Sequence, residues 1–74
     1  MTRYNGHKNW NHWNVSLWLY NDEKLYRTMV WAVTHFSTLD EAAHYINRLT
    51  DDKTPDGAPY TFTSIRAAIA NWET

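Results

Sequence analysis

The sequence predicts an all-α fold, a small single domain of about four short helices, and three observations lead to it. Apolar residues recur at the three- and four-residue spacing of amphipathic helices. Residues that cap helices stand just before those segments, and the breaks between them are short. A chain of 74 residues has the length of one domain. We therefore expect a single helical domain over residues 1–74, with an irregular arm at 1–8 and a loop at 51–60.

The first helix is expected over about residues 10–20. Asn9 can cap it, because its side chain can accept a hydrogen bond from the free amides that follow. Asn14 falls in the middle of the aromatic side of this helix, and a buried amide that lacks hydrogen bonds costs about 1–3 kcal/mol. On a helical wheel the aromatic side consists of Trp10, Trp13, Leu17, Trp18 and Tyr20, and the opposite side carries Val15 and Leu19.

The second helix is expected over about residues 22–36. Asn21 is the predicted N-cap, and the acidic residues that follow it suit the positive end of the helix dipole. Glu23 and Arg27 have the i,i+4 spacing of an ion pair on one helix. The predicted buried face consists of Leu25, Tyr26, Met29, Val30, Ala32, Val33 and Phe36.

A capping box predicts the start of the third helix, over about residues 39–50. Thr38 supplies the capping hydroxyl and Glu41 the carboxylate three residues later. The expected buried stripe has helical spacing and consists of Leu39, Ala42, Ala43, Ile46 and Leu49.

The loop at 51–60 separates the third helix from the last one. Within it, Thr54-Pro55-Asp56-Gly57 has the residue preferences of a type I turn. Thr61 or Thr63 can cap a final helix over about residues 63–73. The expected buried stripe of that helix consists of Ile65, Ala68, Ile69 and Trp72.

One alternative to an entirely helical fold stays open. β-branched and aromatic residues collect at 15–20 and again at 60–63. Such residues favour strands, so a short strand or two at these places is the competing interpretation.

Composition narrows the class of protein. The chain has no cysteine, so disulfides and thiolate metal ligands are excluded. Five Trp, five Tyr and two Phe suggest that buried aromatic rings supply the stability a small core lacks. The net charge of −1 provides no strong basic field for nucleic acid. Neither a membrane span nor a signal peptide is apparent, so we expect a cytoplasmic protein.

Several stretches of the chain resemble one family. They are Asn9-Trp10, Trp13-Asn14-Val15, Leu17-Trp18, Asn21-Asp22-Glu23, Leu25-Tyr26, Pro55-Asp56-Gly57-Ala58-Pro59-Tyr60 and Ser64-Ile65-Arg66-Ala67-Ala68. The pattern is similar to that of a family of very small proteins of unknown function encoded by bacteriophages and mobile elements. The resemblance implies a phage-like origin, and with it a protein that binds and redirects host machinery such as restriction or CRISPR systems. It implies no catalytic or binding residue.

No catalytic or metal-binding constellation is apparent. The serines lack the context of an activated nucleophile, and two glycines are too few for a phosphate-binding loop. His44 shares a helix face with Asp40 and Glu41, but zinc needs three or four converging ligands, and a solvated face explains this spacing. We therefore expect no enzyme, no metal and no cofactor.

Trp31 is the residue most indicative of a binding surface. On the second helix it lies opposite the predicted buried face, near Lys24, Arg27 and His35. Arg27 precedes it by four residues, so its guanidinium can lie across the indole. Aromatic residues and arginine are enriched at the centres of protein interfaces. The sequence thus predicts a non-enzymatic protein-binding module, a modulator or inhibitor of a host (defence) complex, unless another part of the chain covers Trp31.

Three other functions remain open. A binder of single-stranded nucleic acid would use Arg3, Tyr4, Lys8 and Trp10 for phosphate contacts and stacking. A small-molecule or nucleotide-sequestering protein would use the aromatic first helix as a pocket, with the Asn14 amide reading the ligand. The Trp31 face could instead join copies of the chain into a homo-oligomer. The acidic residues Asp51, Asp52 and Asp56 are expected to be solvated or to meet a basic partner.

Overall fold

The computed structural model describes the backbone of residues 9–72 and the side chains of residues 9–70. Within that part of the chain it contains four helices: α1 (Trp10–Asn21), α2 (Glu23–His35), α3 (Leu39–Leu49) and α4 (Phe62–Trp72). The all-α fold of four short helices is therefore confirmed. The predicted arm at 1–8 lies outside the described residues.

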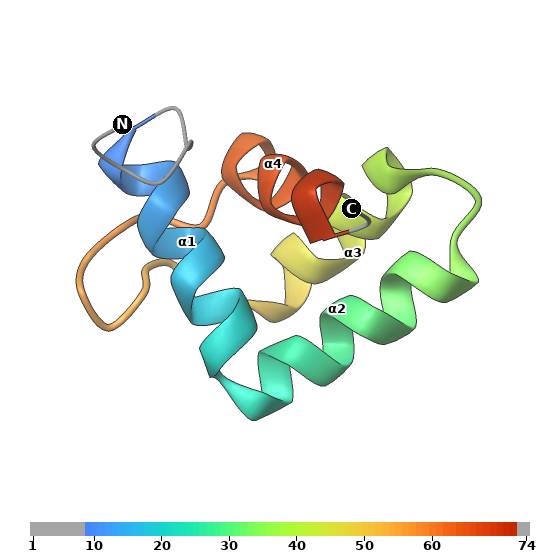
Figure 1. Ribbon diagram of the computed structural model, residues 1–74, viewed down its shortest axis with the longest axis horizontal. Helices are drawn as coiled ribbons and strands as arrows, with labels where there is room; N and C mark the ends of the chain where they lie inside the picture. The colour runs from blue at the N-terminus through green and yellow to red at the C-terminus, as the bar shows by residue number, and fades with distance from the viewer. Residues whose placement is uncertain (1–8, 73–74) are drawn as a thin grey trace.

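The helices form a closed ring of contacts (Figure 1). Each packs against the next in chain order, and α4 returns to pack against α1. The Tyr20 hydroxyl reinforces this closure by donating a hydrogen bond to the carbonyl of Ala68, at 3.1 Å. The alternative of strands was wrong, because helices cover both stretches proposed for them except residues 60 and 61. An isolated bridge between Lys53 and Pro59 is the extended pairing that the described residues make.

Side-chain caps set three of the helix starts as predicted. Asn9 accepts from the amide of His12 at 3.0 Å, and Thr38 accepts from the amide of Glu41 at 3.1 Å. Of the two threonines proposed for the last helix, Thr61 is the one that caps it, with Ser64 closing a reciprocal box.

The predicted cap of the second helix was wrong by one residue. Asp22, not Asn21, accepts from the amide of Leu25, at 3.1 Å. Asn21 is the last residue of α1, and the Asp22 amide still donates to the Trp18 carbonyl. One residue therefore ends α1 and begins α2, which leaves no room for a separate linker.

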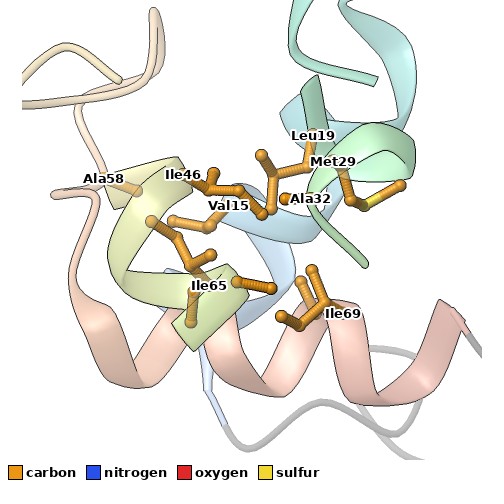
Figure 2. Packing of buried hydrophobic residues seen from close by; sticks show 11 residues of the cluster. Val15, Leu19, Met29, Ala32, Ile46, Ala58, Ile65 and Ile69 are labelled. Carbon is orange, nitrogen blue, oxygen red and sulfur yellow. The ribbon is translucent and has the colours of Figure 1, made fainter. Parts of the chain in front are cut away.

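The core is aliphatic, which corrects the expectation that buried aromatic rings stabilise the domain. Figure 2 shows small and branched side chains from all four helices meeting at the centre. The described aromatic residues lie around this cluster and are half-buried or exposed. The fully buried members are Val15, Leu19, Met29, Ala32, Ala42, Ala43, Ile46, Ala58, Ile65, Ala68 and Ile69. Rings this large do not fit between short helices that approach closely through alanine.

Two predicted helix faces are partly wrong, and α1, for which no buried face was predicted, buries one side. On α1 the side with Val15 and Leu19 is fully buried, whereas Trp10 on the aromatic side is 39% exposed. Tyr26 and Leu49 were expected in the core but are exposed at 39% and 56%. Both lie near a helix end or edge, where the four-helix ring provides no further layer to cover them.

The loop after α3 is fastened to α1 by the Asn14 side chain. Asn14 is 1% exposed, and its amide nitrogen donates to the Asp56 carboxylate at 2.9 Å. Its amide oxygen accepts from the hydroxyl of the buried Thr54. The Trp18 indole nitrogen donates to the same carboxylate oxygen of Asp56 at 3.0 Å. The prediction that a buried Asn14 must be hydrogen-bonded is confirmed, and Asp56 is exposed as expected although its carboxylate accepts from both Asn14 and Trp18.

The loop is also closed on itself. The amide of Gly57 donates to the carbonyl of Thr54 at 2.9 Å, as the predicted turn requires. Gly57 has φ of 97°, a left-handed conformation that residues with a Cβ rarely adopt. The amide of Ala58 donates to the Thr54 hydroxyl, and that of Thr54 to the Ala58 carbonyl. This short closed loop carries Ala58 into the core and Asp56 to the surface of α1 (Figure 1).

Replacing Asn14 with alanine should lower the free energy of unfolding by about 2–3 kcal/mol, because a buried hydroxyl and a carboxylate lose their partner together. Urea unfolding followed by circular dichroism measures the difference. Asn21→Ala is the matched control, since it removes the same amide from an exposed position on α1. Equal losses in the two variants would show that the network contributes nothing specific.

Stability should depend on the charge of Asp56 in acid. Hydrogen bonds from Asn14 and Trp18 to the carboxylate lower the pKa of Asp56 below its ordinary value of 3.8. A lowered pKa in the folded state stabilises the protein above the unfolded-state pKa, and this contribution is lost as the pH falls through the folded-state pKa. The contribution is thus complete at neutral pH and is lost progressively as the pH falls below about 4.

The measurement compares the wild type with Asp56→Asn at pH 7 and again near pH 2.5. The variant should have a lower free energy of unfolding than the wild type at pH 7. The difference between the two should become smaller in acid, as the wild-type carboxylate takes up its proton. Asp52→Asn controls for the loss of a negative charge, because Asp52 makes no side-chain hydrogen bond to another described residue. The same difference in free energy of unfolding at both pH values would show that the charge of Asp56 does not stabilise the fold.

Candidate functional site

Trp31 faces outward, as predicted. Its side chain is 45% exposed near the centre of α2, while Met29 and Ala32 on the other side of the helix are fully buried. No described part of the chain encloses the indole.

Three rings hold the indole in place. His35 stacks on it, with centroids 4.5 Å apart and planes 15° from parallel. Phe36 meets it edge-on at 5.9 Å, and Tyr45 of α3 lies at 5.2 Å. Aromatic contacts at such separations contribute about 0.5–1.5 kcal/mol each beyond burial. Trp31 is therefore exposed but positioned by the fold.

The His35 ring is itself fixed by the backbone of α2. Its Nδ1 lies 2.8 Å from the carbonyl oxygen of Trp31, one helical turn earlier. A carbonyl can only accept, so this contact requires the proton on Nδ1. The hydroxyl of Thr34 lies 3.1 Å from the same nitrogen and bonds the carbonyls of Val30 and Trp31. These contacts keep the imidazole parallel to the indole.

Arg27 does not take the position that the sequence suggested. Its guanidinium pairs with the Glu23 carboxylate, which confirms the predicted i,i+4 pair. Both side chains are about three-quarters exposed, so the pair adds little to stability, roughly 0.2–1 kcal/mol. The group that stacks on Trp31 is His35 instead of Arg27, because the carboxylate one turn earlier attracts the guanidinium.

Two open hollows flank the indole. One has a volume of about 390 Å³ and is lined by Arg27, Thr28, Trp31 and Tyr45. The other, of about 350 Å³, lies along α2 and is lined by Tyr26, Arg27, Val30, Trp31, Thr34 and His35. We refer to the residues of these two hollows together as the Trp31 surface. It brings together three of the four predicted contact residues.

Lys24, the fourth predicted contact residue, lines neither of these hollows. It lies at the start of α2, beside a third hollow next to the 51–60 loop, which we call the loop hollow. The loop hollow has a volume of about 270 Å³ and is built by α1, the start of α2, the end of α3 and the 51–60 loop. Its lining consists of Trp18, Asp22, Lys24, Leu25, Leu49, Thr50, Asp51, Lys53, Pro55 and Tyr60. The sequence did not indicate this site, because helical spacing does not show which loop residues fold back against α1 and α2.

The pKa of the Tyr60 hydroxyl reflects the burial and the charges at the loop hollow. Burial raises its pKa above the ordinary value of 10.0, and the carboxylates of Asp22 and Asp51 raise it further. The hydroxyl of Tyr60 therefore lies close enough to both carboxylates to respond to their charge.

The residues proposed for nucleic acid are only partly described. Trp10 is 39% exposed at the start of α1. Arg3, Tyr4 and Lys8 lie outside the described residues. The Asn14 amide is not free to recognise a nucleotide as the sequence suggested, because its nitrogen bonds to Asp56 and its oxygen to Thr54.

The described histidines and acidic residues do not form a metal site. Among residues 9–72, no three such side chains converge closely enough to hold an ion. Asp40 pairs with Arg66 of α4 at 2.7 Å, and His44 stacks on Phe62 at 4.3 Å. The helix face that these residues share thus connects α3 to α4.

Comparison with known proteins gives a family and no function. The model of the family of unknown function DUF7249 matches residues 1–74, and the chain therefore belongs to that family. No curated protein matches the chain, and no solved structure does. Within the described residues, no helix combines the length and the apolar character needed to cross a bilayer.

Proposed function

We propose that this member of the family is a non-enzymatic protein-binding module, and that it contacts its partner through the Trp31 surface. The observation that carries the proposal is an indole 45% exposed although three neighbouring rings hold it in one orientation. Such a side chain has little conformational entropy left to lose on binding. Its remaining apolar area can be removed from water by a partner.

The surroundings of Trp31 suit a protein partner. Tryptophan, tyrosine and arginine dominate the binding energy of interfaces, and Tyr26, Arg27 and Tyr45 lie around the indole. The two hollows accept side chains on either side of Trp31, so a partner can enclose the ring and exclude water from it. Arg27 and Glu23 lie near the edge, where an exposed ion pair can exchange partners at low cost.

The family resemblance supports a more specific proposal about the partner. We propose a phage-encoded protein that acts in the cytosol of the host cell as a modulator or inhibitor of a host complex, such as a defence system. The small size of the domain and its lack of an evident catalytic constellation among the described residues are consistent with action by binding. The same surface could alternatively join two copies of the chain.

Replacing Trp31 with alanine should weaken partner binding by at least about ten-fold, which is the loss expected for an interface hot spot. The partner is first captured from lysate of the bacterial host, and its affinity is then measured by calorimetry with both proteins purified. The variant should stay folded, because the indole contributes no atom to the fully buried core.

Trp10→Ala is the matched control, since it removes a tryptophan of similar exposure from α1. Loss of binding in Trp10→Ala with no loss in Trp31→Ala would contradict the proposal. Salt-dependent binding of single-stranded DNA or RNA that depends on Trp10 would support the nucleic-acid alternative instead. Sedimentation equilibrium tests self-association, and a strict monomer excludes a role of the surface in joining copies.

A further inference from the structure

The loop hollow combines aromatic residues with charged groups that are free to meet a ligand. Trp18 and Tyr60 line it together with two carboxylates and two ammonium groups. None of the four charged side chains forms an ion pair with another described residue. The hollow is also less open than those at the Trp31 surface, since the loop, α1 and the ends of α2 and α3 all contribute walls.

The charges in this region favour a cation over an anion. Burial raises the pKa of the Tyr60 hydroxyl, and the nearby carboxylates of Asp22 and Asp51 raise it further. A third carboxylate, that of Asp56, lies 3.0 Å from the indole nitrogen of Trp18. Asp56 does not line the hollow itself, but with it the carboxylates at and beside the site number three against two lysines.

The lysines can leave the site more easily than Asp22 can. Lys24 and Lys53 are exposed, and an ammonium on a flexible four-carbon stem turns outward into water at little cost. Asp22 cannot turn away freely, because one of its oxygens caps α2 by accepting from the Leu25 amide. The Asp22 carboxylate therefore stays at the hollow while the ammonium groups of the lysines can turn away from it.

The aromatic lining adds a second attraction for cations. The face of tryptophan attracts a guanidinium or ammonium group better than those of tyrosine or phenylalanine do. The bond to Asp56 holds the Trp18 side chain in one position, and the amide of Tyr60 is fixed by a 3.0 Å bond to the Asp52 carbonyl. Leu25 and Leu49 supply apolar surface for the stem that carries the charge.

We infer that the loop hollow binds a guanidinium or alkylammonium group on an apolar stem, as an arginine or lysine side chain carries it. Asp51 and Asp22 meet the charge, and Trp18 and Tyr60 contact the group beside them. This site is separate from the role proposed for Trp31 and does not depend on it. The ligand group can belong to a protein or to a free amino acid, since both carry the same chemistry.

Nuclear magnetic resonance of the ¹⁵N-labelled full chain tests the inference. N-acetyl-L-arginine amide is titrated at constant ionic strength, and the indole Nε1–H of Trp18 and the amide of Tyr60 are followed. Saturable shifts are expected, and Asp51→Asn should weaken the affinity roughly three-fold, the effect of one exposed charge contact. Asp52→Asn is the matched control, because this neighbour is exposed but does not line the hollow. The control should bind as the wild type does.

Two further ligands and one variant complete the test. Lys24→Gln should tighten the binding of the cation, and the neutral analogue N-acetyl-L-citrulline amide should give no saturable shift. Free arginine that binds more tightly than the blocked amide would identify a free amino acid as the source, and equal binding would identify a protein side chain. Equal binding of the citrulline analogue, or inorganic phosphate that shifts the same signals and loses affinity in Lys24→Gln, would overturn the inference.

Discussion

The fold depends on satisfying one buried amide. Asn14 lies inside the packed face of α1, where its nitrogen and oxygen would each cost free energy without a partner. The partners come from about forty residues later, from the Thr54 hydroxyl and the Asp56 carboxylate. The 51–60 loop therefore has to cross α1 at this point, and in doing so it carries Ala58 into the core. The route of the chain from α3 to α4, and the walls of the loop hollow, follow from that contact.

The small size of the core explains why so much aromatic surface remains accessible. Alanines from α2, α3 and α4 let these short helices approach closely, and branched side chains fill the space that is left. Twelve large rings cannot enter such a core without separating the helices, so the described ones lie around it. Tyr20, Phe36, Tyr45, Tyr60 and Phe62 are partly buried and pack against it. Others, with Trp31 foremost, are fixed by their neighbours and still face water, which is the arrangement a binding surface needs.

The predicted helices and most of their caps came from local chemistry. A capping side chain acts on amides within three residues, so Asn9 and Thr38 could be identified from sequence alone. The cap of α2 was misplaced because Asn21 and Asp22 are both good caps, and α1 extends far enough to include the first of them. The buried face of α1 could not be predicted from the sequence, for a different reason. A helix that is apolar nearly all round has no periodic signal to orient it, and only its neighbours decide which side they cover.

The sequence by itself determined the class of the fold and the number of helices, because both follow from apolar spacing and capping residues along the chain. It also determined the outward direction of Trp31, which follows from spacing along one helix. Tertiary structure alone decided which ring of another helix lies beside that indole: Tyr45 of α3 reaches it at 5.2 Å because α2 and α3 pack together. It alone built the loop hollow as well. That site joins three helices and the 51–60 loop, and its geometry arises from where the buried Asn14 amide finds its partners.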